Sequence, residues 1–162
     1  MCMKHLIILS VVFILITSCS EESSLFDPTY FGEGFKGITF TLEDGPEPIK
    51  VDPSDWCYYN PGNIDPGGGL PLGFSFGAAF PNPTYLGGYT TVPFTIPQST
   101  AVYIYVINNQ YQVVAVLVNE VLNAGSYQIQ FDTNSIGATG VYRVVFETEN
   151  VSCKGDIWIK SK

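Results

Sequence analysis

A hairpin-like segment in the second half of the chain, Ala101 to Val118, constrains the fold more than any other feature. It reads AVYIYVINNQYQVVAVLV, two runs rich in Val, Ile and Tyr that meet at a polar turn, Asn108 to Gln110. Residues of these types favour strands, and Asn tolerates the positive φ that a tight turn requires. Neither run contains Pro or Gly. We therefore expect both strands to lie in the interior of a sheet, paired with the strands that follow.

The rest of residues 76–162 alternates strand formers with turn formers. Thr90 to Pro97 places apolar residues on one face and Pro93 on the other, which favours an edge strand. Ser126 to Asp132 alternates in the same way, and Val141 to Glu147 and a last strand near the C-terminus follow it. The chain has 16 Gly and 11 Pro and no long helical pattern. The spacing predicts an all-β, two-sheet antiparallel sandwich over residues 76–162.

Residues 37–75 read as an irregular segment packed on this sandwich. We expect one strand, Gly37 to Leu42, with Ile38, Phe40 and Leu42 on the same side. After it, residues 46–71 are dense in Pro, Gly, Asp and Asn and predict a loop. Its acidic residues lack the regular spacing of a calcium loop, so we expect no metal site.

An aromatic group, Trp56, Tyr58 and Tyr59, lies within this loop. One interpretation is an exposed platform that binds a glycan or a peptide. The other is that Trp56 and its neighbours pack the loop onto the sandwich, because large rings bury well. The second interpretation is favoured.

The N-terminus reads as a targeting segment. Lys4 and His5 precede an apolar run that is too short to span a bilayer and ends in Ile-Thr-Ser-Cys19. This ending resembles the lipobox of bacterial lipoproteins. The resemblance implies a signal peptide over residues 1–18, removal of that peptide and acylation of Cys19. An ordinary secretory signal or a small anchor helix would be the alternatives.

Residues 19–36 then form a lipidated N-terminus and a flexible linker. The linker begins Ser20-Glu21-Glu22, which resembles the surface-export signal of Bacteroidetes lipoproteins. A serine after the lipidated cysteine also resembles the proteobacterial pattern for the outer membrane. We therefore expect a protein anchored in the bacterial outer membrane, facing either the periplasm or the cell surface.

Two cysteines remain in the mature chain besides Cys19. Cys57 and Cys153 form an even pair, and an even pair in an exported protein favours a disulfide. We expect this bond to join the irregular segment to the last hairpin. In the chain-entropy model it contributes up to about 4–5 kcal/mol.

The order of several short motifs in the sandwich resembles a known family. The motifs are Phe80-Pro81-Asn82-Pro83, Thr91-x-x-Phe94-Thr95-Ile96-Pro97, Ala124-Gly125 before a strand that ends in Phe131-Asp132, and Gly140-Val141-Tyr142. They resemble the small immunoglobulin-like domain shared by the flagellar hook-capping protein and the C-terminal sorting domains of type IX secretion cargo. The resemblance implies an immunoglobulin-like sandwich.

The sequence argues against catalysis. The sole histidine, His5, lies in the segment that is removed, which excludes a His-dependent triad or metal site in the mature chain. No Gly-rich phosphate loop is present, and most carboxylates lie in turns or linkers, where we expect nothing to raise a pKa. The net charge of -8 argues against nucleic acid as a partner. We expect no enzyme activity, no cofactor and no metal.

These observations predict a lipid-anchored structural or interaction module. Its partner would be another envelope or surface protein, bound by strand addition at an exposed sheet edge. The alternatives are a ligand-binding module that uses residues 56–59, and an attachment domain for the secretion machinery.

Overall fold

The computed structural model describes residues 38–50, 52, 55–57 and 71–162, and the described part is built almost wholly of strands. In chain order the elements are β1 (Phe40–Leu42), β2 (Gly45–Lys50), β3 (Ser75–Phe76), β4 (Thr84–Tyr85), β5 (Tyr89–Ile96), β6 (Thr100–Ile107), β7 (Val113–Leu122), β8 (Gly125–Asp132), the 3-10 helix η1 (Thr133–Ser135), β9 (Gly140–Glu147) and β10 (Ser152–Lys160).

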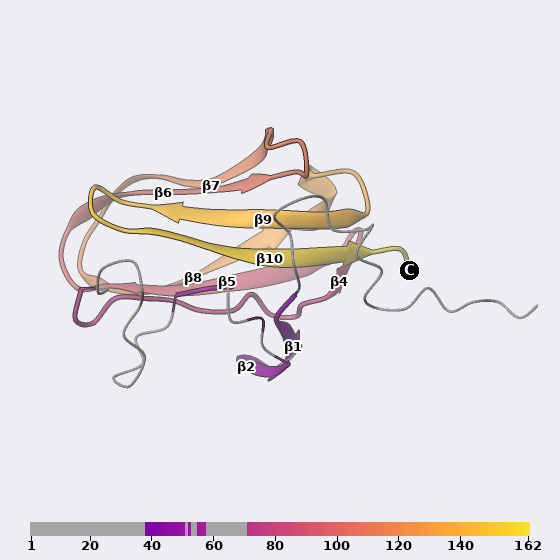
Figure 1. Ribbon diagram of the computed structural model, residues 1–162, viewed down its shortest axis with the longest axis horizontal. Helices are drawn as coiled ribbons and strands as arrows, with labels where there is room; N and C mark the ends of the chain where they lie inside the picture. Colours follow the sequence, from indigo (N-terminus) through magenta and orange to yellow (C-terminus); the bar gives the residue numbers. More distant parts are fainter. Residues whose placement is uncertain (1–37, 51, 53–54, 58–70) are drawn as a thin grey trace, which may run out of the picture.

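Two of the sheets face each other as a sandwich (Figure 1). One has the order β4-β10-β9-β6-β7 and the other has the order β3-β5-β8, while β1 and β2 form a separate hairpin. All pairs are antiparallel except β4 with β10. The order β10-β9-β6-β7 opposite β3-β5-β8 corresponds to strands G-F-C-C′ opposite A-B-E of an immunoglobulin-like sandwich. The predicted all-β sandwich is confirmed.

The core lies between the two sheets and is formed by alternate residues of the longer strands. In β5 the inward residues are Val92, Phe94 and Ile96, as the alternation predicted. The ring of Phe146 in β9 lies 5.5 Å from that of Phe94 and 5.2 Å from that of Phe76. These contacts join strands of both sheets, so the aromatic side chains fix how one sheet sits on the other.

The central hairpin forms as predicted, but its second strand is not interior. β6 pairs with β7 on one side and with β9 on the other, which leaves β7 at the edge of its sheet. The next strand, β8, pairs with β5 in the opposite sheet and not with the hairpin. The absence of Pro and Gly from β7 is therefore compatible with an interior position but does not require one. The sequence pattern does not state which strands pair.

The edge position predicted for β5 from Pro93 is wrong, because β5 lies between β3 and β8. The Pro93 carbonyl accepts a hydrogen bond from Gly77 N–H at 2.8 Å. Since N and C=O of one strand residue point the same way, the missing N–H of Pro93 faces the segment that follows β3. The β3–β5 pairing ends at Phe76, so no carbonyl of that segment requires an N–H donor from Pro93.

The irregular segment contains more structure than predicted. β2 pairs with β1 although it carries Pro46 and Pro48. Leu42 is 52% exposed, whereas Thr39 and Thr41 are buried. Thr41 Oγ1 donates to the Ala79 carbonyl at 2.7 Å, whereas Phe40 packs against the buried Ile38 and Val141, so β1 buries part of both of its faces.

Candidate functional site

The two edges of the five-stranded sheet differ sharply, and this difference defines the candidate site. At the β10 side every second residue directs its backbone groups away from β9, as in any antiparallel strand. Lys154 C=O accepts from Trp56 N–H at 2.6 Å, and Lys160 C=O accepts from Leu86 N–H at 2.8 Å. Short β4 pairs with the last two residues of β10.

Side chains cover the middle of this edge in place of a strand. Asp156 N–H donates to Asp55 Oδ1 at 3.2 Å, and Trp158 N–H donates to Asn82 Oδ1 at 2.9 Å. Asn82 Nδ2 donates to the carbonyls of Asp156, at 2.8 Å, and Thr39, at 2.9 Å. These hydrogen bonds cover the middle of the β10 edge, which we call the closed edge, and they also bind Thr39, the residue before β1, to it.

A buried charge cluster supports the closed edge. Arg143 in β9 donates from Nε and Nη2 to the two carboxylate oxygens of Asp156, at 2.7 and 2.8 Å. Asp55 accepts from Thr39 N–H at 3.1 Å and lies close enough to Asp156 to be repelled by it. Burial, followed by the charges of Asp156 and Asp52, raises the pKa of Asp55 from 3.8 to about 8.

Burial also raises the pKa of Asp156, although the hydrogen bonds from Arg143 oppose that shift. The expectation that nothing raises the pKa of carboxylates in turns or linkers is therefore wrong for Asp55, whereas Asp156 lies in strand β10 and was not covered by it. Both residues are almost fully buried, at 6% and 1% exposed. Their oxygens accept hydrogen bonds from within the protein, and the arrangement can fasten segments together but presents no carboxylate to a substrate.

Trp56 packs on the sandwich, so it cannot serve as part of an exposed platform. Trp56 is 6% exposed and its ring lies 5.1 Å from that of Phe76. The ring also lies where a Cβ of residue 155 would be, which requires Gly155 in β10. Tyr58 and Tyr59, the other predicted members of the platform, lie outside the described residues.

The predicted disulfide is present and lies beside Trp56. Cys57 and Cys153 are bonded, with Cα atoms 5.9 Å apart and a sequence separation of 96 residues. Cys57 also exchanges two backbone hydrogen bonds with Phe76 of β3, at 2.7 and 2.9 Å. The bond therefore joins the irregular segment to the β9–β10 hairpin, as the sequence predicted.

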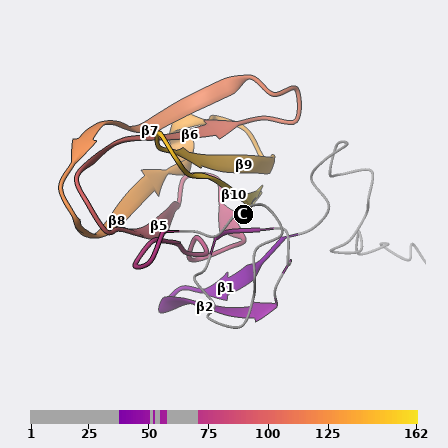
Figure 2. The same cartoon turned by 60° about the vertical axis from the view of Figure 1, so that its left-hand side comes forward.

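The opposite edge of the same sheet is open. β7 is ten residues long, and within the described residues its outer edge pairs with no strand (Figure 2). The hydrogen bond of the Thr148–Val151 turn fixes which residues of β9 direct their backbone groups toward β6. When the same alternation is followed across the β9–β6 and β6–β7 pairs, the N–H and C=O groups of Asn119 and Val121 point away from β6, outside the sheet. Val113, Val116 and Val121 are 51%, 53% and 69% exposed. β7 contains no Pro or Lys, the residues that commonly protect an edge.

Two register shifts, between residues 104 and 105 and between 106 and 107 of β6, bend β7 relative to its partner. The second open edge, β8, differs in character. Its outward residues Ser126, Gln128 and Gln130 are polar and exposed. β7 is therefore the edge at which unsatisfied backbone groups and exposed apolar side chains coincide.

A pocket of about 380 Å³ lies at the C-terminal end of β7. Ala101 and Tyr103 of β6 line it, together with Val121 and the glutamates at positions 120, 147 and 149. The rings of Tyr103 and Tyr105 stack 4.6 Å apart, and Tyr105 Oη donates to Glu147 Oε1 at 3.1 Å. Burial and this hydrogen bond raise the pKa of the Tyr105 hydroxyl.

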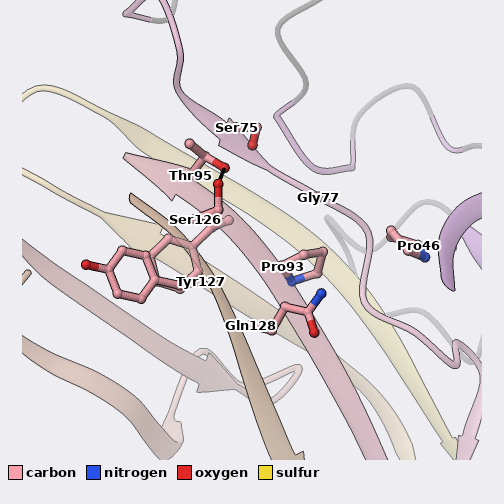
Figure 3. A pocket seen from close by; sticks show the side chains of 9 residues that line it. Pro46, Ser75, Gly77, Pro93, Thr95, Ser126, Tyr127 and Gln128 are labelled. Carbon is pink, nitrogen blue, oxygen red and sulfur yellow. Dashed lines mark hydrogen bonds between the residues drawn. The ribbon is translucent and has the colours of Figure 1, made fainter. Parts of the chain in front are cut away.

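Figure 3 shows another pocket of about 380 Å³, on the outer face of the three-stranded sheet. Three of its four hydroxyls are already engaged, since Thr95 and Ser126 are bonded to each other at 3.0 Å and Tyr127 Oη donates to the Asn123 carbonyl at 2.7 Å. Apart from Tyr127 no ionisable side chain lines it. It offers little to select a ligand.

Exposed aromatic residues also gather at a third pocket, of about 500 Å³, which the sequence analysis missed. Tyr85 and Tyr89 line it and are 47% and 53% exposed, with Leu42 and Glu43 beside them. Lys160 Nζ lies 5.7 Å from the centre of the Tyr85 ring. The spacing Tyr85-x-x-x-Tyr89 carries no periodic signal that marks the two rings as neighbours.

Cys19, the predicted lipid attachment site, lies outside the described residues. In the described part of the chain no helix is both long and apolar enough to span a bilayer. The same part contains no group of three or more His, Cys, Asp or Glu residues placed to hold a metal ion.

Comparison with known proteins gives weak structural likeness and no sequence match. The chain matches no protein family and no curated protein sequence. It is similar to the crystal structure of the Ig1 domain of mouse SynCAM 2, at 15% identity and a TM-score of 0.30, over 49% of this chain and 89% of that domain. A likeness at this TM-score supports no inference about function.

Proposed function

We propose that this protein is a lipid-anchored, non-catalytic module of the bacterial cell envelope that binds another envelope or surface protein. The observation that carries the proposal is the open edge of β7. A strand of the partner adds there, and its backbone forms the hydrogen bonds that β7 leaves unmade. The exposed valines of β7 then contact alternate side chains of the added strand.

The contrast with β10 supports this role for β7. Side chains and loops form hydrogen bonds with the outward backbone groups of β10 from the Lys154 carbonyl to the Trp158 N–H, so the fold covers this edge from within the protein. Soluble proteins usually protect a long edge because it pairs readily with other chains. An edge of ten residues that keeps apolar side chains exposed is therefore better explained by binding than by folding.

Site-specific photo-crosslinking in intact cells tests the edge. A photoreactive residue at position 121 is expected to yield a covalent adduct with one partner, and the same residue at Gln128 on β8 is not. Asn119→Pro removes an outward N–H without touching the β6–β7 ladder, and it should abolish the adduct. Asn119→Ala is the matched control and should retain it. An adduct that persists in Asn119→Pro would contradict strand addition.

The anchor is tested separately, at Cys19. Cys19→Ser should abolish incorporation of labelled palmitate and move the protein from the membrane to the soluble fraction. Protease treatment of whole cells then separates surface exposure from a periplasmic location. A wild-type protein that takes up no label and remains soluble would refute the anchor.

Ligand binding at the Tyr85–Tyr89 pocket is the second candidate function. Exposed tyrosine rings at a concave site are typical of glycan recognition. Tyr85→Ala and Tyr89→Ala should each reduce retention on a glycan matrix without changing the urea midpoint. Equal retention of both variants and the wild type would exclude this pocket.

A sorting role, which the resemblance to type IX cargo domains implies, needs a different test from truncation. The last strand, β10, pairs with both β9 and β4. Its removal would unfold the sandwich whether or not it carries a signal. Substitution of the exposed terminal residues Ser161 and Lys162 leaves the sheet intact, and unchanged surface display of that variant would argue against sorting.

A further inference from the structure

We infer that the strand received by β7 is basic, with a Lys or Arg side chain that lies over Tyr103 at the C-terminal end of the edge. This inference rests on the proposed function, since it names the chemistry of the partner at the same edge. The outward backbone groups and exposed valines of β7 define where the partner lies. The charges around that edge define what the partner must carry.

The edge is acidic at the end where the partner would meet the pocket. Glu120 belongs to β7 itself, Glu147 ends β9 and Glu149 lies in the turn that follows. Glu120 and Glu149 are exposed and Glu147 is half-buried. No lysine or arginine lines this pocket. A neutral or acidic strand at this position would leave Glu147 and Glu149 without a counter-charge.

The sheet register shows how a long cationic side chain reaches these groups. Asn119 pairs with Tyr103, and Tyr103 pairs with Glu147, so these three residues form one row across the outer face. An added strand lies about 4.8 Å beyond β7, and about 10 Å from β6. The side chain opposite Asn119 therefore extends toward the Tyr103 ring, where a cation is favoured by the face of the ring.

Contacts between the two tyrosines hold the Tyr103 ring in place for a cation. Tyr103 is held by Tyr105 at 4.6 Å, and Tyr105 is held in turn by its hydrogen bond to Glu147. A half-buried aromatic surface beside a carboxylate suits the apolar stem and charged head of Arg or Lys. Arg fits best, because its planar head stacks on a ring and also donates to a carboxylate.

Charge complementarity excludes a second copy of this chain as the occupant. The sequence contains no Lys or Arg between Lys50 and Arg143, so the β6–β7 hairpin of a second copy brings no cation to the pocket. Arg143 is itself buried and bonded to Asp156. The chain as a whole carries a net charge of -8, which opposes self-association.

A pair of synthetic strand-forming peptides tests the inference on the full-length chain in detergent. Both peptides alternate Thr and Val, and they differ only in a central residue, Arg in one and its neutral isostere citrulline in the other. Fluorescence anisotropy of the labelled peptides gives the affinities. We expect the Arg peptide to bind at least about tenfold more tightly, and this preference to fall with added salt.

Two sets of variants separate the charge from the edge. Glu147→Gln combined with Glu149→Gln should bring the Arg peptide to the affinity of the citrulline peptide, whereas Glu43→Gln, an exposed glutamate in the β1–β2 turn, should change nothing. Asn119→Pro should abolish binding of both peptides. Free arginine amide is the third probe and should bind far more weakly than the Arg peptide, because it lacks the backbone contacts.

The outcomes are distinguishable. Equal affinity of the two peptides in the wild type, with both lost in Asn119→Pro, would overturn the basic partner and leave strand addition intact. Arginine amide that binds as tightly as the Arg peptide, with binding unaffected by Asn119→Pro, would show a site for a free cation and overturn both. Binding of neither peptide at millimolar concentration would likewise overturn both.

Discussion

Replacement of Asp55 by Asn should remove a loss of stability that the wild type undergoes as the pH rises from 5 to 7. The pKa of Asp55 is raised from 3.8 to about 8 by burial and by the nearby charges of Asp156 and Asp52. Between these two values the folded state holds a proton on Asp55 that the unfolded state has released. Stability contributed by this proton is complete below about pH 4 and is lost as the pH rises to about 8.

The magnitude follows from proton linkage. One proton held only by the folded state changes the free energy of unfolding by about 1.4 kcal/mol per pH unit. Between pH 5 and pH 7 the wild type should therefore lose about 2.7 kcal/mol relative to Asp55→Asn. With urea slopes of about 1–3 kcal/mol per molar, the midpoints of the two proteins should diverge by about 1–3 M. The amide of Asn is neutral at every pH and keeps an oxygen acceptor for Asp156 N–H, but its NH2 group replaces the oxygen that accepts from Thr39 N–H. That loss lowers the stability of Asp55→Asn by a similar amount at every pH, so the pH dependence is the quantity that tests the claim.

Urea titrations at pH 5, 6, 7 and 8, followed by tryptophan fluorescence, measure this difference. Asp44→Asn is the matched control, because Asp44 is exposed in the β1–β2 turn, and its pH profile should parallel the wild type. Other carboxylates add their own pH dependence to both proteins, so only the difference between the profiles reports on Asp55. Parallel profiles of the wild type and Asp55→Asn would refute the claim that Asp55 is protonated in the folded protein.

Three further predictions concern the closed edge. Cys57→Ser with Cys153→Ser opens a loop of sequence separation 96 and should lower the free energy of unfolding by about 4–5 kcal/mol in urea titrations; a loss below 1 kcal/mol would show that the loop is restrained by other contacts. Gly155→Ala places a Cβ inside the Trp56 ring and should cost about 1–3 kcal/mol, with a changed tryptophan emission maximum; an unchanged spectrum would contradict the contact. Asn82→Ala removes three side-chain hydrogen bonds to backbone groups and should cost about 2–4 kcal/mol, with faster amide exchange along β10 but not along β7.

Strand positions with clear alternation were predictable from the sequence. The inward faces of β5 and β8 follow from a period of two, because one face of each strand is buried against the other sheet and one is not. The alternation of apolar and polar residues predicts which face of a strand is buried, but it does not predict which strands pair with it. The interior position expected for β7 and the edge position expected for β5 were both wrong for this reason.

The closed edge could be predicted only in part. The disulfide followed from cysteine counting, but Asp55 and Asp156 are 101 residues apart and nothing local joins them. One signal was present, since Arg143 and Asp156 each interrupt an apolar strand, and a charge at such a position needs a partner. β2 was missed because Pro46 and Pro48 argue against a strand, although a two-stranded edge tolerates them.

The placement of the closed edge has a consequence for the anchor proposed at Cys19. The described chain begins at Ile38, which packs with Val141 and Trp158 on the β9–β10 side of the sheet. Under the proposed anchor at Cys19, the tether would join the sandwich at that flank, and three strand spacings, about 14 Å, separate β10 from β7. The proposed anchor then enters at the flank where Asp55 and Asn82 cover the backbone of β10, and the edge proposed to receive a partner lies on the opposite side of the sheet.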